Sequence, residues 1–108
     1  MPSNLGELEQ LVLLVLLRLG EEGYGVPVRA MLAQRARRRV SLGTIYKTLV
    51  RLEAKGLVST WMGEPTPERG GRRKKHYRVT PPGRRALTRS LNALRSLGRG
   101  LDPAWQVP

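Results

Sequence analysis

Residues 5–19 carry apolar side chains at helical spacing, with further leucines between them. One face of a helix drawn through this stretch holds Leu8, Leu11, Val12, Val15, Leu16 and Leu19. Leu13, Leu14 and Leu17 fall on other sides, so the helix is apolar nearly all round and must be covered on more than one side. In so short a chain, we expect the second cover to come from another subunit.

Two more helices are predicted before the middle of the chain. A glycine-rich turn at residues 20–25 is followed by a helix that begins near Val26 and Pro27, where proline is tolerated in the first turn. This helix ends in the basic residues of 35–39. Apolar positions then predict a third helix over residues 42–55.

Residues 57–62 and 75–79 alternate as two strands do, and residues 63–73 between them are rich in Gly and Pro, which suits a long exposed hairpin loop. A last helix is predicted over residues 81–97. Its leucines recur at a spacing close to that of a coiled coil, and the tail from residue 98 has no clear pattern.

Capping residues support these boundaries. Asn4 suits the N-cap of the first helix, with Glu7 at the third position of a capping box. Ser41 suits the N-cap of the third helix, and Gly56 its C-terminal end. Thr80 stands before two prolines and suits the N-cap of the last helix.

The order of three helices, a hairpin and a helix predicts a winged helix-turn-helix with a C-terminal extension. The fold class is mainly α with a small β-hairpin (α+β). We divide the chain into a winged helix-turn-helix DNA-binding domain at 1–80, a C-terminal dimerisation helix at 81–101 and an irregular tail at 102–108.

Charge narrows the class of partner. The 108 residues include 20 Lys and Arg against 8 Asp and Glu, a formal net charge of +12, and the positive charge begins after an acidic first stretch. Such a balance favours a polyanion, either nucleic acid or an anionic membrane. The chain has no Cys and one His, so thiolate sites and zinc sites with two imidazoles are excluded, and we expect no metal or cofactor.

The third helix carries the candidates for reading DNA bases. Its exposed face is predicted opposite the apolar one and combines hydroxyls with cations, which can contact base edges in a major groove. The candidates are Gly43, Thr44, Lys47, Thr48 and Arg51, with Lys55 on the same side. A surface helix is also polar on its outer side without any ligand, so this face alone does not decide the function.

The hairpin supplies candidates for phosphate contact. They are Arg69, Arg72, Arg73, Lys74 and Lys75. A basic hairpin beside a helix that fits a groove can contact the adjacent phosphates, although an isolated run of this kind is often merely solvated. His76 is interpreted as a phosphate contact or a surface residue, and Trp61 as packing in the sheet or under the wing.

The chain resembles the PadR family of bacterial transcription regulators. The resemblance rests on Tyr24-Gly25, on Gly43-Thr44-Ile45-Tyr46, on Arg51-Leu52-Glu53, on Gly56-Leu57-Val58 and on the run from Gly70 to Thr80. It covers about residues 5–100 and implies a homodimeric winged-helix DNA-binding repressor of the compact subgroup with one C-terminal helix. The family pattern also implies backbone contact by Tyr46, which helical projection alone would place near the core. Lys47 departs from the pattern, because many members have Pro there.

Tyr24 and Ser41 complete the candidates for DNA backbone contact. The dimer candidates are Leu13, Leu14, Leu17, Leu87, Leu91, Leu94 and Leu97. Trp105 could cover a dimer groove or contact a small aromatic effector, since some compact relatives bind planar molecules between their C-terminal helices.

Other classes of function are less favoured. No nucleophile and base pair can be assembled, so an enzyme is not expected. The main alternative is a small basic RNA-binding or ribosome-associated protein, although aromatic residues for stacking are few. A protein-interaction module that uses the leucine-rich first and last helices is a third possibility. A membrane partner is not expected, because the basic residues do not line up opposite one long apolar face. No export signal or membrane span is apparent, and a cytoplasmic location is expected.

Overall fold

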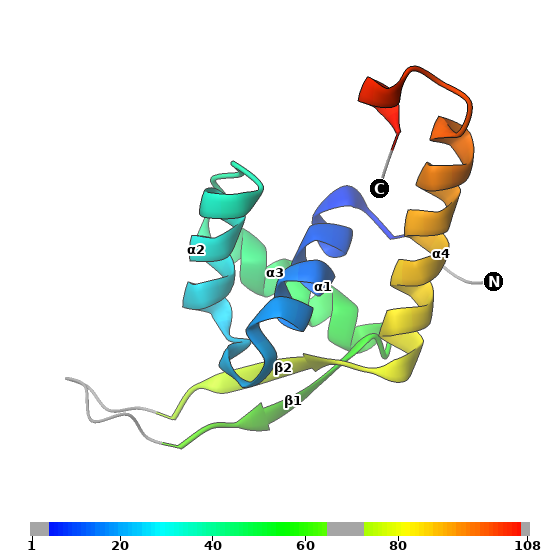
Figure 1. The fold of residues 1–108 in the computed structure, drawn as a ribbon. Coiled ribbons are helices and arrows are strands. Elements are labelled where there is room, and N and C mark those ends of the chain that lie inside the picture. The colour runs from blue at the N-terminus through cyan, green and yellow to red at the C-terminus, as the bar shows by residue number, and fades with distance from the viewer. Residues whose placement is uncertain (1–4, 65–72, 107–108) are drawn as a thin grey trace.

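The computed structural model describes residues 5–64 and 73–106. Three helices, α1 (Glu7–Leu19), α2 (Gly25–Arg35) and α3 (Leu42–Ala54), are followed by the strands β1 (Val58–Met62) and β2 (Lys75–Val79) and by α4 (Pro81–Gly98). Short 3-10 turns lie at Gly20–Glu22 and Pro103–Trp105. Figure 1 shows α1 between α2 and α4, with the hairpin below the helices. The predicted winged helix-turn-helix is confirmed.

Helix α1 is central because it packs against α2, α3, α4 and β2. The largest side chains with no exposure come from the three N-terminal helices. They are Val12, Leu13, Val28, Leu32, Ile45, Leu49 and Leu52. Leu13 was predicted to face a second subunit, and this was wrong. The contacts of α1 on several sides place Leu13 in the core of its own chain.

The start of α1 differs from the prediction, whereas the caps of α3 and α4 agree with it. Asn4 lies outside the described residues, and the N-cap is Gly6, whose N–H donates to Oε1 of Glu9 at 2.8 Å. The acid of the capping box is therefore Glu9 and not Glu7. The Ser41 side chain accepts from the N–H of Thr44, and the Thr80 side chain from that of Gly83, as expected.

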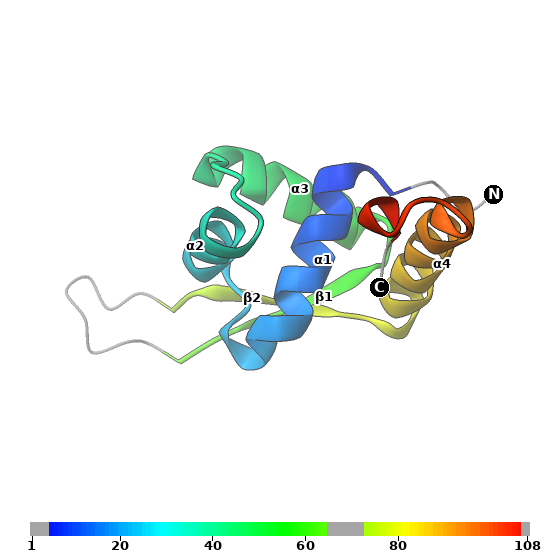
Figure 2. The same ribbon diagram turned by 45° about the horizontal axis from the view of Figure 1, so that its top comes forward.

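The hairpin is antiparallel, with Val58 opposite Val79 and Thr60 opposite Tyr77. Tyr77 and Val79 are buried against the helices. The N–H of Tyr77 donates to the carbonyl of Gly23 at 2.7 Å, which fixes β2 beside the start of α2. Figure 2 shows α1 crossing over the two strands. The hairpin is therefore held on one side by the helical core and leaves its other side to solvent.

Helix α4 packs on the core only through its first turns. Ala86 and Leu87 are buried, whereas Leu94 and Leu97 are 49% and 80% exposed. The prediction that Leu87 belongs to a dimer surface was wrong, because this side chain fills the core of its own chain. The helix ends at Gly98, and the tail, predicted to be irregular, contains a 3-10 turn. Within the described part of the chain, no helix is long and apolar enough to cross a membrane.

Candidate nucleic-acid interface

The outer side of α3 is formed by residues that recur at helical spacing. Gly43, Tyr46, Lys47, Val50 and Arg51 together line a shallow open hollow. A side chain at Gly43 would meet nothing within 4 Å, so the helix begins with open space on this side. Tyr46 is 41% exposed, which excludes a core position. This face presents two cations, a phenol and an apolar surface, a mixture that suits base edges in a major groove.

Thr48 does not belong to this face. Its side chain is buried, and its hydroxyl donates to the carbonyl of Thr44 one helical turn earlier, at 2.9 Å. The prediction that Thr48 is exposed with Lys47 and Arg51 was wrong, because α1 covers more of α3 than the apolar pattern alone indicated. Thr44 is exposed, and its hydroxyl accepts from that of Ser41 at 2.9 Å.

Val50 was missed by the sequence reading. Its side chain is 57% exposed on the outer side of α3. The signal was present, since Val50 follows Tyr46 by four residues and Gly43 by seven, which places all three on one side of a helix. A search for cations and hydroxyls passed over an aliphatic side chain, although such a side chain can contact a thymine methyl group.

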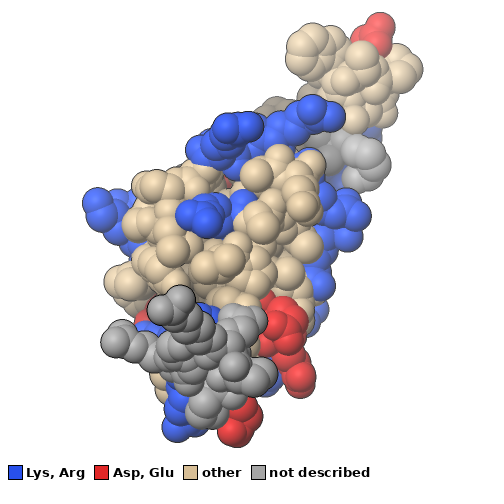
Figure 3. Space-filling model, turned by 90° about the vertical axis from the view of Figure 1, so that its left-hand side faces the viewer, with Lys and Arg blue, Asp and Glu red and all other residues tan. Residues whose placement is uncertain are grey.

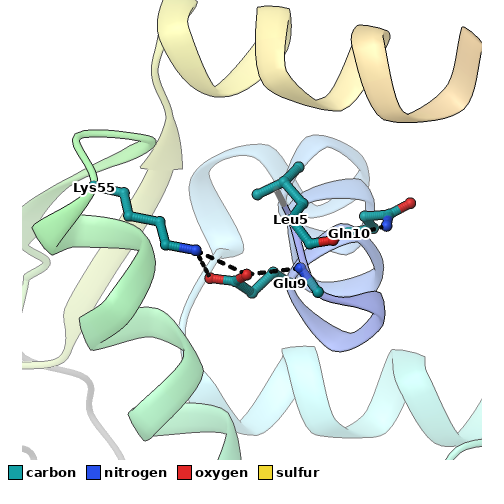
Figure 4. Close-up of polar contacts among 5 residues, drawn as sticks. Leu5, Glu9, Gln10 and Lys55 are labelled. Carbon is teal, nitrogen blue, oxygen red and sulfur yellow. Dashed lines mark hydrogen bonds and ion pairs between the residues drawn. The ribbon is translucent and has the colours of Figure 1, made fainter. Parts of the chain in front are cut away.

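Lys55 is held by α1 rather than presented to a ligand. Its ammonium group donates to both carboxylate oxygens of Glu9, at 2.8 and 3.0 Å (Figure 4). Figure 4 also shows Gln10 donating to the carbonyl of Leu5 at the same end of α1. The Glu9 side chain is 11% exposed, so this contact is a largely buried connection between the first and third helices.

The Glu9 carboxyl has a lowered pKa. Burial acts to raise this pKa, but it is outweighed by the hydrogen bonds from Lys55 and the Gly6 N–H and by the charges of Lys55 and Arg51. The pKa therefore lies below its ordinary value of 4.5, and Glu9 is ionised at neutral pH.

The solvent side of the hairpin is built around His76. The Nδ1 atom of His76 lies 2.7 Å from the carbonyl oxygen of Glu21, and its ring lies against Tyr24 and Trp61, with centroids 5.1 and 5.0 Å away. The Arg78 guanidinium lies 4.6 Å from the Trp61 ring centre. His76 thus joins the strand to the start of α2. The sequence predicted a phosphate contact or a surface residue and did not indicate these contacts.

The described cations of the hairpin lie on both of its sides. The Lys74 ammonium lies 5.8 Å from the Tyr24 ring centre, and Arg73 donates to the carbonyl of Gly63 at 3.0 Å. Lys75 lies 3.6 Å from a Glu53 oxygen, with both side chains well exposed. Arg69 and Arg72 lie outside the described residues. Tyr24 and Lys74 therefore share the side of the hairpin at the start of α2. Lys75 lies on the opposite side, 5.7 Å from the Tyr77 ring centre and near the end of α3.

Among the described residues, no group of three or more His, Asp and Glu could hold a metal ion. What the described surface offers is the outer side of α3 with a basic hairpin next to α2, an arrangement suited to a nucleic-acid duplex.

Comparison with known proteins agrees with this geometry. The model of the transcriptional regulator PadR-like family matches residues 12–89, which is most of the chain. The chain belongs to the PadR-like family. PadR-like proteins are DNA-binding transcription regulators, and the resemblance to this family inferred from the sequence motifs is confirmed.

Individual PadR relatives support the same assignment. A PadR family regulator from Clostridium difficile has a TM-score of 0.72 at 25% identity, covering 85% of this chain and 91% of that one. One from Eggerthella lenta is 31% identical with a TM-score of 0.66, covering 88% and 82%. The transcriptional regulator Rv3488 of Mycobacterium tuberculosis is 48% identical over 61 residues, which are 56% of this chain and 53% of that protein. The matched part thus spans about half the length of that regulator.

Proposed function

We propose that this protein is a homodimeric transcriptional repressor that binds duplex DNA at an inverted repeat. The observation that carries the proposal is the outer side of α3. Lys47, Val50 and Arg51 are exposed together there, next to a glycine that allows close approach. In a helix-turn-helix protein, this helix is the one that enters the major groove.

Within this proposal, contacts divide into two groups. Gly43, Thr44, Lys47, Val50 and Arg51 read base edges, since they line the outer side of α3 or its exposed start. The groups on the phosphates are Tyr24, Ser41, Tyr46, Arg73, Lys74 and Lys75, joined by Arg69 and Arg72. Hydroxyl groups and cations suit phosphate oxygens and fix the position of the helix without reading sequence.

The dimer is supported by leucines that the chain leaves exposed. Leu14 and Leu17 in α1 are each 37% exposed, and Leu94, Leu97 and Leu101 range from 49% to 80%. Burying such side chains is favourable by about 1.5–3 kcal/mol each when the burial is complete. A second copy that covers α4 with its α1 would place two α3 helices on one face of a duplex, about 34–36 Å apart.

The deciding experiment is selection of bound fragments from random duplex DNA, followed by affinity measurements at several salt concentrations. We expect a palindromic consensus whose half-sites are one helical turn apart. Lys47→Ala should change preference at particular bases, whereas Lys75→Ala should weaken all sequences alike. Selection of no consensus, or tighter binding to single-stranded RNA than to any duplex, would overturn the proposal.

The proposal also includes a small aromatic effector that binds next to Trp105. Trp105 is 74% exposed on the tail next to the end of α4, where a planar molecule or the second copy could cover it. Quenching of tryptophan fluorescence by a planar compound, lost in Trp105→Leu and kept in Trp61→Leu, would support it. No quenching that depends on Trp105 would contradict it. A cytoplasmic location follows from the proposed role on DNA.

A further inference from the structure

The turn between α2 and α3 contains an arginine in an unusual backbone conformation. Arg37 has φ of +54°, and within the described residues it is the one non-glycine residue with positive φ. The N–H groups of Ala36 and Arg38 both donate to the carbonyl of Leu32, at 3.1 and 3.0 Å. Helices often end in this way with glycine at the left-handed position, because glycine takes this conformation without steric cost.

Residues with a strained backbone conformation are often found at functional sites, which suggests a function for the Arg37 side chain. Arg37 stands in a basic stretch, Arg35 to Arg39, at the end of α2. Arg38 is bonded to Glu7 at the start of α1. Arg37 and Arg39 are exposed, and no acid within the described residues pairs with either. The turn is thus attached to α1 through one arginine and presents two others to solvent.

The distance between these arginines and the hairpin is close to the width of a major groove of duplex DNA. Ser41, the N-cap of α3, follows Arg37 by four residues. The hairpin meets the other end of α2, where the ring of Tyr24 contacts that of His76. Helix α2 has 11 residues and a length of about 16 Å, so it separates the two basic elements by slightly more than the roughly 12 Å width of a major groove. Figure 1 shows the turn and the hairpin at opposite ends of α2.

We propose that Arg37 and Arg39 bind DNA phosphates on the edge of the major groove opposite to the edge contacted by the hairpin. Figure 3, seen from the side of α2, shows Lys and Arg side chains on the upper part of this face. With α3 in the groove, cations at both ends of α2 would contact both edges. The inference rests on the proposed duplex binding and adds a second anchoring point, which fixes how α3 lies in the groove.

The test compares Arg37→Gly with Arg99→Gly in the full chain, on the DNA duplex selected for the wild type. Both variants remove one positive charge from an exposed position, but Arg99 follows the end of α4, away from α2. Glycine relieves the strain at position 37, so we expect a thermal midpoint that is unchanged or higher by up to about 4 °C. The affinity of an Arg37→Gly dimer should fall about 100-fold, because a charge-assisted hydrogen bond worth about tenfold is lost in each copy.

The salt dependence supplies the second readout. A dimer that loses one phosphate contact in each copy should lose about 2 from the slope of log affinity against log salt, at roughly 0.9 per phosphate. Arg37→Lys should keep most of the affinity, and Arg39→Gln should lose about as much as Arg37→Gly. Wild-type affinity and slope in Arg37→Gly, or equal losses in Arg99→Gly, would overturn the inference while duplex binding stands. A wild type that binds no duplex would overturn both proposals.

Discussion

Two sides of this small molecule are built from the same helices and differ in what they leave exposed. The outer side of α3 and the hairpin expose cations, tyrosines and one valine. The outer sides of α1 and α4 expose leucines, up to 80% in the case of Leu97. Both exposed sides lie opposite the hydrophobic core, because α1, α3 and α4 each bury their other side in that core.

The two sides differ in whether exposure to water is favourable. Exposed cations are well solvated, so the α3 side is stable in water without a partner and is free to bind a polyanion. Burial of exposed leucine surface is favourable by about 25 cal/mol per Å², so the α1 and α4 side is the one that is stabilised by a lasting protein contact. If α1 and α4 form the proposed dimer contact and α3 the proposed DNA contact, substitutions on one side should leave the other side's property unchanged.

The largest effect is expected where α1 faces its own core. Leu13→Ala removes a side chain with no exposure and should lower the free energy of unfolding by about 2–5 kcal/mol, through lost burial and the cavity it leaves. Leu14→Ala, measured in the monomeric state where the proposed dimer contact does not contribute, is the matched control, since the neighbouring side chain is 37% exposed and should cost less than half as much. Urea unfolding of both variants measures this. Equal losses would contradict the assignment of Leu13 to the core.

The next effect tests the leucine side directly. Leu97→Glu places a charge on a side chain that contributes little to the folded monomer, so unfolding of the monomer should change by less than about 0.5 kcal/mol. Dimer dissociation should become at least about 100-fold easier, roughly 2.7 kcal/mol, because the charge would be buried between copies. Sedimentation over a concentration series measures it. Ser96→Glu adds the same charge beside it, and an equal effect there would show that no leucine contact is involved.

A smaller effect concerns the contact that holds α1 against α3. Glu9→Gln removes the charge that pairs with Lys55 and should cost about 1–2 kcal/mol, between the values for exposed and buried ion pairs. The cost should depend on pH. Because the pKa of Glu9 is lowered in the folded state, its stabilisation is complete above 4.5 and is lost as the pH falls through the lower folded value.

The stability difference between wild type and Glu9→Gln should therefore narrow as the pH falls below 4.5. Unfolding by urea at a series of pH values measures it. Glu7→Gln is the control, since Glu7 is 73% exposed in its pair with Arg38 and should change stability by less than about 0.5 kcal/mol. A difference that stays constant down to acid pH would contradict the charged pair.

The elements of the fold could be predicted from the sequence because local signals agree. The strand at Lys75–Val79 has the predicted bounds, and Ser41 and Thr80 cap the helices they were expected to cap. Such signals depend on neighbours within a few residues. Side-chain alternation and hydroxyl caps are of this kind, and no knowledge of tertiary contacts is needed to use them.

The faces were harder to predict, because burial depends on elements distant in the sequence. Thr48 looks polar in the sequence but is covered, its hydroxyl satisfied within its own helix. Leu13 looks surplus on a helical projection, but α1 has neighbours on several sides. Glu9 could not be assigned to Lys55 by any local rule, since 46 residues separate them. Helical periodicity gives the direction of a side chain and not the presence of a neighbour.

The smallest effect is expected at the one described ion pair that involves the hairpin. Glu53 lies 3.6 Å from Lys75 and accepts from the Thr60 hydroxyl at 3.3 Å, with both charged side chains well exposed. Glu53→Gln should change the free energy of unfolding by less than about 0.5 kcal/mol, as expected for an exposed pair. The same change should raise affinity for duplex DNA about two- to fivefold at low salt, because Lys75 is no longer shared between a carboxylate and a phosphate.

That gain should vanish at high salt, where exposed charges are screened. Asp102→Asn is the matched control, since it removes one negative charge in the tail and keeps the side-chain oxygen that accepts from the Ala104 N–H. Binding titrations at two salt concentrations measure both variants. An equal gain in Asp102→Asn would mean that only net charge matters. A gain confined to Glu53→Gln would show that Lys75 acts on the phosphates from its place on the hairpin.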